Sequence, residues 1–315
     1  IERPIVFGNN DTPGVVLASA AKEYLKIYGV LVGKKPIIFT NNDSAYETAI
    51  EFKNNGIEPI ILDTRSNPKS EIVDEAKNLG INIKFSHVVV AANGYKKVNS
   101  AQIAQISANK KDLGIIQKIN CDCICVSGFW TPSIHLSSQS GNKTKFDDKI
   151  DAFVPGKSKQ NETTVGSANG IFNLEETINT SFEKGYELSK KITNKDNKVS
   201  IPQVSEKNYT SHDKFWCVPL PDKKNYKRFL DFQNDVTVSD IELALREGYR
   251  SIEHVKRYTT LGMATDQGKT SNLNGLQLVS DVENKIVPSV GHTTFRPPYT
   301  PVSIGAIVGR EVGKH

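Results

Sequence analysis

Residues 35–63 read KPIIFTNNDSAYETAIEFKNNGIEPIILD, and this stretch decides the expected fold. The apolar run at 35–40 predicts a buried strand, and residues 44–54 have the spacing of a helix. A second apolar run at 58–62 predicts another strand, which ends at Asp63. Strand, helix and strand in this order indicate a β-α-β unit within a parallel sheet.

The turn after the first strand, Thr40 to Ala45, lacks the glycines that let a dinucleotide pyrophosphate approach the backbone. Asp63 nevertheless stands where such a domain carries its ribose-binding carboxylate. The other interpretation is a surface turn residue before Arg65, and the missing glycines favour that one slightly.

The flanking sequence continues the same α/β pattern. We expect helices at 15–28, 70–79 and 100–109, a strand at 83–92, an apolar stretch at 115–119 and a strand at 121–127. Alternation in the last strand would place Cys121, Cys123 and Cys125 on one face, as buried thiols rather than metal ligands.

Composition bounds the class of protein. The 315 residues are 37% hydrophobic, enough for two or more domains, and the net charge of +5 is spread without a concentrated basic stripe. We therefore expect no nucleic-acid partner. No apolar run suits a membrane span and no signal peptide is evident, so we expect no membrane association and a cytoplasmic location. Cys217 is isolated in the sequence, which fits a reducing compartment.

A turn of small residues, Gly166-Ser167-Ala168-Asn169-Gly170, precedes a helix expected at 174–191. Such a turn can hold a phosphate at a helix N-terminus, and it is equally common as a plain connection. Residues 193–211 are polar without an apolar period and read as a linker.

The second informative stretch, residues 254–272, reads HVKRYTTLGMATDQGKTSN. Its basic residues, hydroxyls and two glycines, Gly262 and Gly268, are typical of a site for phosphate or carboxylate. The alternative is a basic helix C-terminus followed by a polar loop. A Walker A loop is excluded, because the spacing is one residue too long and a helix precedes it.

Short helices, the first capped by Thr237 or Ser239, predict a small α-domain around these residues, at about 229–283. The proline-rich stretch from 291 onward resembles the start of a further domain.

Several long, collinear stretches resemble the α subunit of heterotetrameric sarcosine oxidase. They are ERPIVFGNNDTPGVVLASAA, IIFTNNDSAYETA, VSGFWTPSIHLSSQSG, AFVPG, GSANGIFNL, DFQNDVT, EGYRSIEHVKRYTTLGMATDQGKTSNLNG and TTFRPPYTPVSIGA. They cover essentially the whole chain, so the resemblance is far more specific than any single motif.

The resemblance implies an α/β, disulfide-reductase-like fold followed by a small α-helical, ferredoxin-module-like domain. Its expected parts are a second nucleotide-binding-like domain (1–125), a return segment of the first, NAD-binding domain (126–192), a linker (193–228), the small α-domain (229–285) and the start of a folate-binding, aminomethyltransferase-like domain (286–315). The main glycine fingerprint of the NAD site would precede Ile1.

The resemblance also implies which residues adjoin cofactors. The expected NAD neighbours are Ser127, Gly128, Gly166, Ser167, Ala168, Asn169, Gly170, Phe172 and Leu174. The expected contacts to the phosphate of FMN, shared with the β subunit, are Lys256, Arg257, Thr265, Gln267, Lys269, Thr270 and Ser271. In cluster-bearing relatives of the small domain, cysteines stand where this chain has Asp231, Gln233, Asp266 and Ser271. None is a thiol, so no iron-sulfur cluster or other metal is expected.

The implied activity is that of an oxidoreductase acting on a CH-NH group. Sarcosine would be oxidised to glycine, with peroxide formed and the one-carbon unit passed to tetrahydrofolate. The implied partners are β, γ and δ subunits, with FAD and the catalytic residues on a partner and the folate site mostly outside this chain. Two alternatives stay open: an α-type subunit of N-methylglutamate dehydrogenase, and a noncatalytic scaffold.

Overall fold

A computed structural model of the chain describes residues 1–196, 200–204, 212–221, 226–295, 297, 299–308 and 310. The expected linker (193–228) and the expected start of a folate domain (286–315) lie partly outside these residues. In the part of the chain that the structure describes, every helix is too short or too polar to cross a lipid bilayer.

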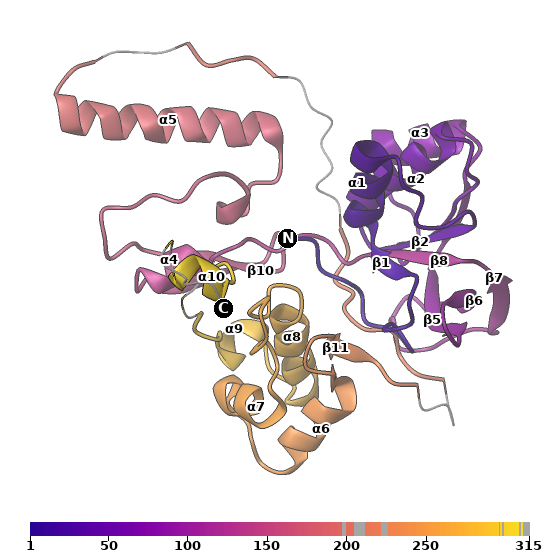
Figure 1. Cartoon of the computed structure of the whole chain (residues 1–315). Helices are drawn as coiled ribbons and strands as arrows, with labels where there is room; N and C mark the ends of the chain where they lie inside the picture. The colour runs from indigo at the N-terminus through magenta and orange to yellow at the C-terminus, as the bar shows by residue number, and fades with distance from the viewer. Residues whose placement is uncertain are drawn as a thin grey trace.

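The N-terminal half has three layers built on a five-stranded parallel sheet (Figure 1). The strand order is β1-β8-β2-β3-β4, with β1 at Val15–Leu17, β2 at Pro36–Thr40, β3 at Ile60–Asp63, β4 at Asn82–Phe85 and β8 at Cys123–Ser127. Three helices pack on one face: α1 (Ala18–Tyr28), α2 (Ser44–Asn54) and α3 (Glu71–Asn78). An antiparallel sheet covers the other: β5 (His87–Gly94), β6 (Val98–Gln105) and β7 (Gln117–Asn120).

Three expectations for this half were wrong in part. Of residues 100–109, expected as a helix, the first six belong to β6, because pairing with β5 and β7 satisfies the hydrogen-bonding groups of their backbone. The strand expected at 83–92 is two strands divided at Ser86, which has a φ of 52°. The helix expected at 15–28 begins at Ala18, after a strand that pairs with β8.

The three clustered cysteines are buried, as expected, but they do not share one face. Cys123 and Cys125 lie in the core between the sheet and the helices, whereas Cys121 precedes β8 and packs in the core on the opposite side. Burial raises the pKa of the Cys121 thiol to about 12, which keeps it protonated.

The turn between β2 and α2 is held by a buried ionic cluster. Arg65 Nη1 lies 2.7 Å from Asp43 Oδ1, and its Nη2 lies 2.8 Å from Asp63 Oδ2. The Tyr46 hydroxyl donates a further hydrogen bond of 2.7 Å to Asp63, and both carboxylates are fully buried. Asp63 is therefore a buried partner of Arg65 rather than an exposed turn residue or an open ribose ligand.

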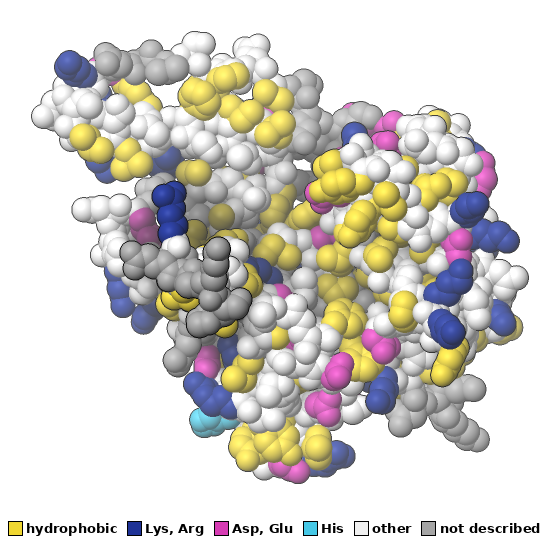
Figure 2. Space-filling view, in the orientation of Figure 1, with side chains coloured by type: hydrophobic (Ala, Val, Ile, Leu, Met, Phe, Trp, Pro, Cys, Tyr) yellow, Lys and Arg dark blue, Asp and Glu magenta, His cyan; other side chains and the backbone are white. Residues whose placement is uncertain are grey.

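The chain then leaves the sheet for a hairpin and a long helix. The elements are α4 (His135–Gln139), β9 (Thr144–Asp147), β10 (Ala152–Pro155), the 3₁₀ turn η1 (Gly166–Asn169) and α5 (Leu174–Thr193). None of the residues of α5, all of which the structure describes, is buried. Figure 1 shows α5 standing away from the sheet domain, and hydrophobic side chains lie open along it in Figure 2.

The small α-domain consists of a short β pair and four helices. They are β11 (Phe229–Asp231), β12 (Val236–Thr237), α6 (Val238–Arg246), α7 (Ile252–Thr259), α8 (Asn272–Val282) and α9 (Val287–Val290), followed by α10 (Ile304–Val308). Thr237 caps α6 in a capping box with Asp240, as one of the two expected caps. The core of the domain extends onto β10 through Phe153. The expected class, an α/β unit followed by a small helical domain, is confirmed.

Candidate functional site

The basic loop lines a pocket of about 440 Å³ on the small α-domain. Helix α7 presents Lys256 and Arg257 in its last turn, and the loop that follows adds Gln267. Among the residues that the structure describes, Glu253 and Thr294 add the other polar side chains of the wall. Three of the seven residues expected at a phosphate therefore meet at one pocket, and two of them are cations.

An acidic side chain shares this pocket. Arg257 Nη1 donates to Glu253 Oε2 at 2.8 Å, and Glu253 Oε1 accepts a bond of 2.9 Å from the Thr294 N–H. Burial opposes ionisation of Glu253, but these two hydrogen bonds and the charges of Lys256 and Arg257 together hold the pKa of the carboxyl below its ordinary value. Glu253 is therefore ionised at neutral pH and competes with any anion for Arg257.

Replacing Glu253 with Gln should increase the affinity of this pocket for phosphate by roughly threefold to tenfold, because a partly exposed like charge is removed. Titration of the chain with inorganic phosphate, followed calorimetrically at low ionic strength, measures the change. Glu242→Gln, on α6 and outside the pocket, is the matched control. Equal affinities for the Glu253 variant and the control would contradict an anion site here.

Lys269 lies on the other side of the loop. Its Nζ donates to the Tyr299 carbonyl at 2.9 Å and lies 4.4 Å from the centroid of the Tyr299 ring. Its neighbours there include the buried imidazole of His135, whose pKa burial and the nearby ammonium lower to about 4. Lys269 does not join Lys256 and Arg257 at the pocket.

The expected hydroxyl donors stabilise the loop itself. Thr265 Oγ1 donates to Gln233 Oε1 at 2.9 Å, and Thr270 Oγ1 donates to Asp266 Oδ2 at 3.2 Å. Ser271 is fully buried, and its hydroxyl has no hydrogen-bond partner among the described residues. Three of the four polar residues at the positions of cluster cysteines, Asp231, Gln233 and Asp266, thus hold this loop by hydrogen bonds.

The two glycines serve packing rather than an approach to phosphate. Gly262 and Gly268 have φ values of 65° and 71°, and an added Cβ at either would lie 2.0–2.2 Å from Oδ1 of Asn272. Their amides also have partners, Asp231 Oδ2 for Gly262 and Asp266 Oδ1 for Gly268. The Asn272 carboxamide therefore lies between two glycine backbones, a role that no local sequence pattern predicts.

Glu253 was also missed from the sequence. It stands four residues before Arg257 on α7, a spacing that places two helical side chains side by side, so the signal was present. Asp231 had no comparable local signal, because Gly262, whose N–H it accepts, is 31 residues away. Asn272 contacts the nearby Gln267 and Gly268, but no residue pattern shows that its side chain enters between the two glycines.

Two expected NAD neighbours, Ser127 at the end of β8 and Gly128 after it, are both packed against other parts of the chain. The Ser127 hydroxyl accepts from Asn42 Nδ2 at 3.0 Å and is fully buried. The Gly128 N–H donates to the Arg3 carbonyl at 2.6 Å, and its own carbonyl accepts from Arg3 Nε at 2.7 Å. A Cβ at Gly128 would lie 3.0 Å from that segment, so close packing accounts for this glycine. Contact with NAD stays a prediction for both.

The Gly166–Gly170 turn does not open α5. The helix begins at Leu174, where Asn173 Oδ1 accepts from the Glu176 N–H at 2.9 Å, and its first turn holds Glu175 and Glu176. Acidic residues at a helix N-terminus disfavour a bound phosphate there. Phe172 packs edge-on against Phe129 with ring centroids 5.7 Å apart. Within the turn, Gly166 is buried, Ser167 is exposed, and Ala168, Asn169 and Gly170 are half-buried.

Comparison with known proteins connects this site to a family. The model of the sarcosine oxidase A3 domain matches residues 225–310, which include the basic pocket. Sarcosine oxidase subunit alpha of Rhizobium meliloti (strain 1021) is 36% identical over 100% of this chain and 30% of its own length. The corresponding subunit of Corynebacterium sp. (strain P-1) is 34% identical over 99% of this chain and 33% of its own length. The chain thus spans about a third of these curated relatives.

Among solved structures, L-proline dehydrogenase from P. horikoshii is similar in fold, with a TM-score of 0.58 and 19% identity. The match covers 98% of this chain and 57% of that one. At this identity the likeness concerns the fold alone.

Proposed function

This chain is related over nearly its whole length to the α subunits of sarcosine oxidase, and from that premise we propose that it serves an oxidoreductase of this type as the part that holds the phosphate of FMN. The pocket beside Lys256 and Arg257 carries the proposal, because it unites two cations in the segment that matches the A3 domain. The proposed complex oxidises sarcosine to glycine with peroxide, passes the one-carbon unit to tetrahydrofolate, and includes β, γ and δ subunits.

The chain's own side chains fit a phosphate at this pocket. Arg257 offers a planar set of donors and Lys256 an ammonium, both at the C-terminal turn of α7. Glu253 holds the Arg257 guanidinium in place until an anion replaces part of that contact. FMN, when bound, would supply the capacity to accept and pass on electrons, and this chain would orient it through the phosphate. Neither side chain is proposed to touch the amine, so we propose that the catalytic residues and FAD are on a partner.

For NAD, we propose that this chain only supports the binding site and does not contact the phosphates. The turn at 166–170 and Phe172 lie close to β10 and Phe129, where Gly170 leaves room for only a hydrogen beside Ile150 and Val154. These residues form a wall rather than a phosphate cradle. We propose that Ser127, Gly128, Gly166 to Gly170, Phe172 and Leu174 support a NAD site whose phosphate contacts are made elsewhere.

Replacing Lys256 and Arg257 together with Ala should lower the FMN content of the assembled complex. Each charged hydrogen bond to a phosphate contributes about 1.5–3 kcal/mol, so affinity should fall by roughly tenfold or more for each residue. Bound flavin is measured by absorbance after gel filtration. The control is Lys285→Ala, a lysine of the same domain that pairs with Glu283 away from the pocket. Unchanged flavin content in the double variant would contradict the assignment of the FMN phosphate to this pocket.

The activity itself is tested with the complete gene product co-expressed with its neighbouring subunits. Turnover with sarcosine and formation of peroxide would support the oxidase. Turnover with N-methylglutamate and without peroxide would instead assign the chain to the dehydrogenase, while the FMN pocket could stand.

A further inference from the structure

Met263 carries the most accessible sulfur atom of the chain. The sequence has four cysteines and one methionine, and the structure describes all of them. Cys121, Cys123 and Cys125 are buried, and Cys217 is half-buried. Met263, in the loop between α7 and α8, is 55% exposed. A small oxidant in solution therefore reaches this thioether more readily than any of the thiols.

The thiols are also held in their less reactive form. A cysteine reacts with a hydroperoxide as the thiolate. Burial raises the pKa of Cys121 to about 12 and also raises the pKa of Cys217, although Arg228 Nη1 donates to that sulfur at 3.4 Å. A hydrogen bond with Cys123 and burial raise the pKa of Cys125 well above its ordinary value. A thioether has no proton to lose, so exposure decides its oxidation, and exposure favours Met263.

Met263 lies in the wall of the basic pocket, together with Lys256 and Arg257. Gly262, with a φ of 65°, turns the chain after α7, and the Met263 N–H donates to the Thr260 carbonyl at 3.1 Å. The backbone that carries the thioether is thereby fixed at the pocket. An oxidation at Met263 would change the wall of the site that we propose for the FMN phosphate.

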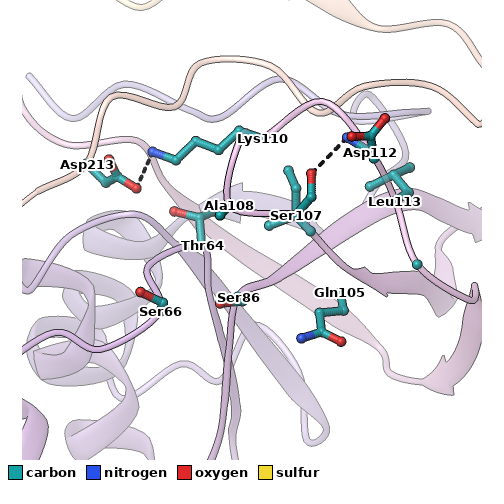
Figure 3. A pocket seen from close by; sticks show the side chains of 12 residues that line it. Thr64, Ser66, Ser86, Gln105, Ser107, Ala108, Lys110, Asp112, Leu113 and Asp213 are labelled. Carbon is teal, nitrogen blue, oxygen red and sulfur yellow. Dashed lines mark hydrogen bonds and ion pairs between the residues drawn. The ribbon is translucent and has the colours of Figure 1, made fainter.

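The other large cleft has no comparable group. It has a volume of about 770 Å³ and lies at the carboxyl ends of β3 and β4, where Lys110 and Asp213 form an ion pair (Figure 3). No sulfur atom occurs among the described residues that line it. Oxidation by a peroxide is therefore expected at the basic pocket and not at this cleft.

We propose that Met263 is a site of oxidation by hydroperoxides and that its sulfoxide weakens the binding of phosphate to the basic pocket. The sulfur gives two electrons to the O–O bond, one peroxide oxygen becomes bonded to sulfur, and the other leaves as water. This inference rests on the proposed function, because the proposed complex forms hydrogen peroxide and holds FMN by its phosphate at this pocket. Accumulated peroxide would then loosen the hold of this chain on FMN.

The sulfoxide changes the chemistry of the wall. A thioether sulfur is only a weak hydrogen-bond acceptor, whereas the sulfoxide is polar and its oxygen accepts hydrogen bonds. At Met263 this oxygen can accept from the cations of the same pocket and compete with a phosphate for them, as the Glu253 carboxylate does. A competing neutral acceptor should lower the affinity for phosphate by roughly threefold to tenfold.

The test is calorimetric titration of the full chain with inorganic phosphate, before and after treatment with hydrogen peroxide, with peptide mapping by mass spectrometry. The proposal expects one added oxygen at Met263 and the threefold to tenfold loss of affinity. An unmodified Met263, or complete oxidation with unchanged affinity, would each overturn it. A chain that binds no phosphate before treatment would overturn the function proposed for the pocket and with it the effect of the sulfoxide. The peptide map would still support or overturn Met263 as the site of oxidation.

Two variants separate the sulfoxide from other damage. Met263→Leu has no sulfur at nearly the same volume, so peroxide should change its phosphate affinity by less than about twofold. Met263→Gln places a permanent oxygen acceptor in the wall and should bind phosphate more weakly than Met263→Leu without any peroxide. Reduction of the treated parent by methionine sulfoxide reductases should restore its affinity. A loss of affinity in treated Met263→Leu, or no recovery after the reduction, would overturn the proposal.

Discussion

Replacing Arg65 with Met is expected to lower the free energy of unfolding by about 3–5 kcal/mol, the largest effect of any single change considered for this chain. The Arg65 guanidinium bridges Asp43 and Asp63 at 2.7 and 2.8 Å. No more than 1% of the surface of either aspartate is exposed. Methionine would fill much of the same space but leave both carboxylates without a counter-ion. Urea unfolding followed by circular dichroism measures the loss.

Arg250→Met is the matched control, because Arg250 is exposed and its partner Glu283 keeps a second ion pair, with Lys285. That change should alter stability by no more than about 0.5 kcal/mol. Adding Asp63→Asn to the Arg65 variant should restore part of the loss, since one of the two stranded charges is removed. A variant at Arg65 as stable as the variant at Arg250 would show that the cluster contributes no more than a surface pair.

The second large effect is expected at Gly268. Replacement with Ala should lower the free energy of unfolding by about 2–5 kcal/mol, about 1–2 from the left-handed backbone and about 1–3 from overpacking. The added Cβ would lie 2.2 Å from the Asn272 carboxamide, which has Gly262 on its other side and accordingly has no space to move into. Because the displaced loop carries Gln267 into the basic pocket, FMN content should fall as well.

Gly185→Ala is the opposite case. Gly185 lies inside α5, and apart from its own helix no described residue has an atom within 4 Å of an added Cβ, so this change should stabilise the protein by about 0.5–1 kcal/mol. The measurement is the urea midpoint of the two glycine variants beside the parent. Equal shifts for both would mean that the packing around Asn272 does not restrict position 268.

Much of the α/β unit could be predicted from local pattern. The helix at 44–54 has the bounds expected of it, because its apolar period and the Gly56 turn are local signals. The segment at 100–109 could not be assigned in this way, because its alanines and isoleucines suit the period of a helix as well as that of a strand. Pairing with β5, which is distant from local pattern, makes its first part a strand, β6. The break between β4 and β5 at Ser86 could not be predicted, because the sequence around it contains no glycine or proline.

The basic site could be predicted only to the level of its segment. Lys256 and Arg257 are adjacent on a helix, so their common direction follows from the sequence. Lys269 follows Gly268, whose positive φ turns the chain toward Tyr299, and no residue type in the loop signals that direction. The packing role of Gly262 and Gly268 likewise could not be predicted, because the Asn272 side chain enters between the two glycines only in the folded loop.

The position of β8 has a consequence for how the protein is made. This strand lies between β1 and β2 in the sheet, so neither Leu17 nor Phe39 gains its neighbour Val126 until the ribosome has released that part of the chain. The same core is completed by Phe215 and Val218, about ninety residues later still. Contacts so distant in sequence make folding slow. During synthesis the apolar residues of β1 and β2 therefore stay exposed until β8 and the later segments have emerged. In that period, binding of chaperones would protect the nascent chain from aggregation.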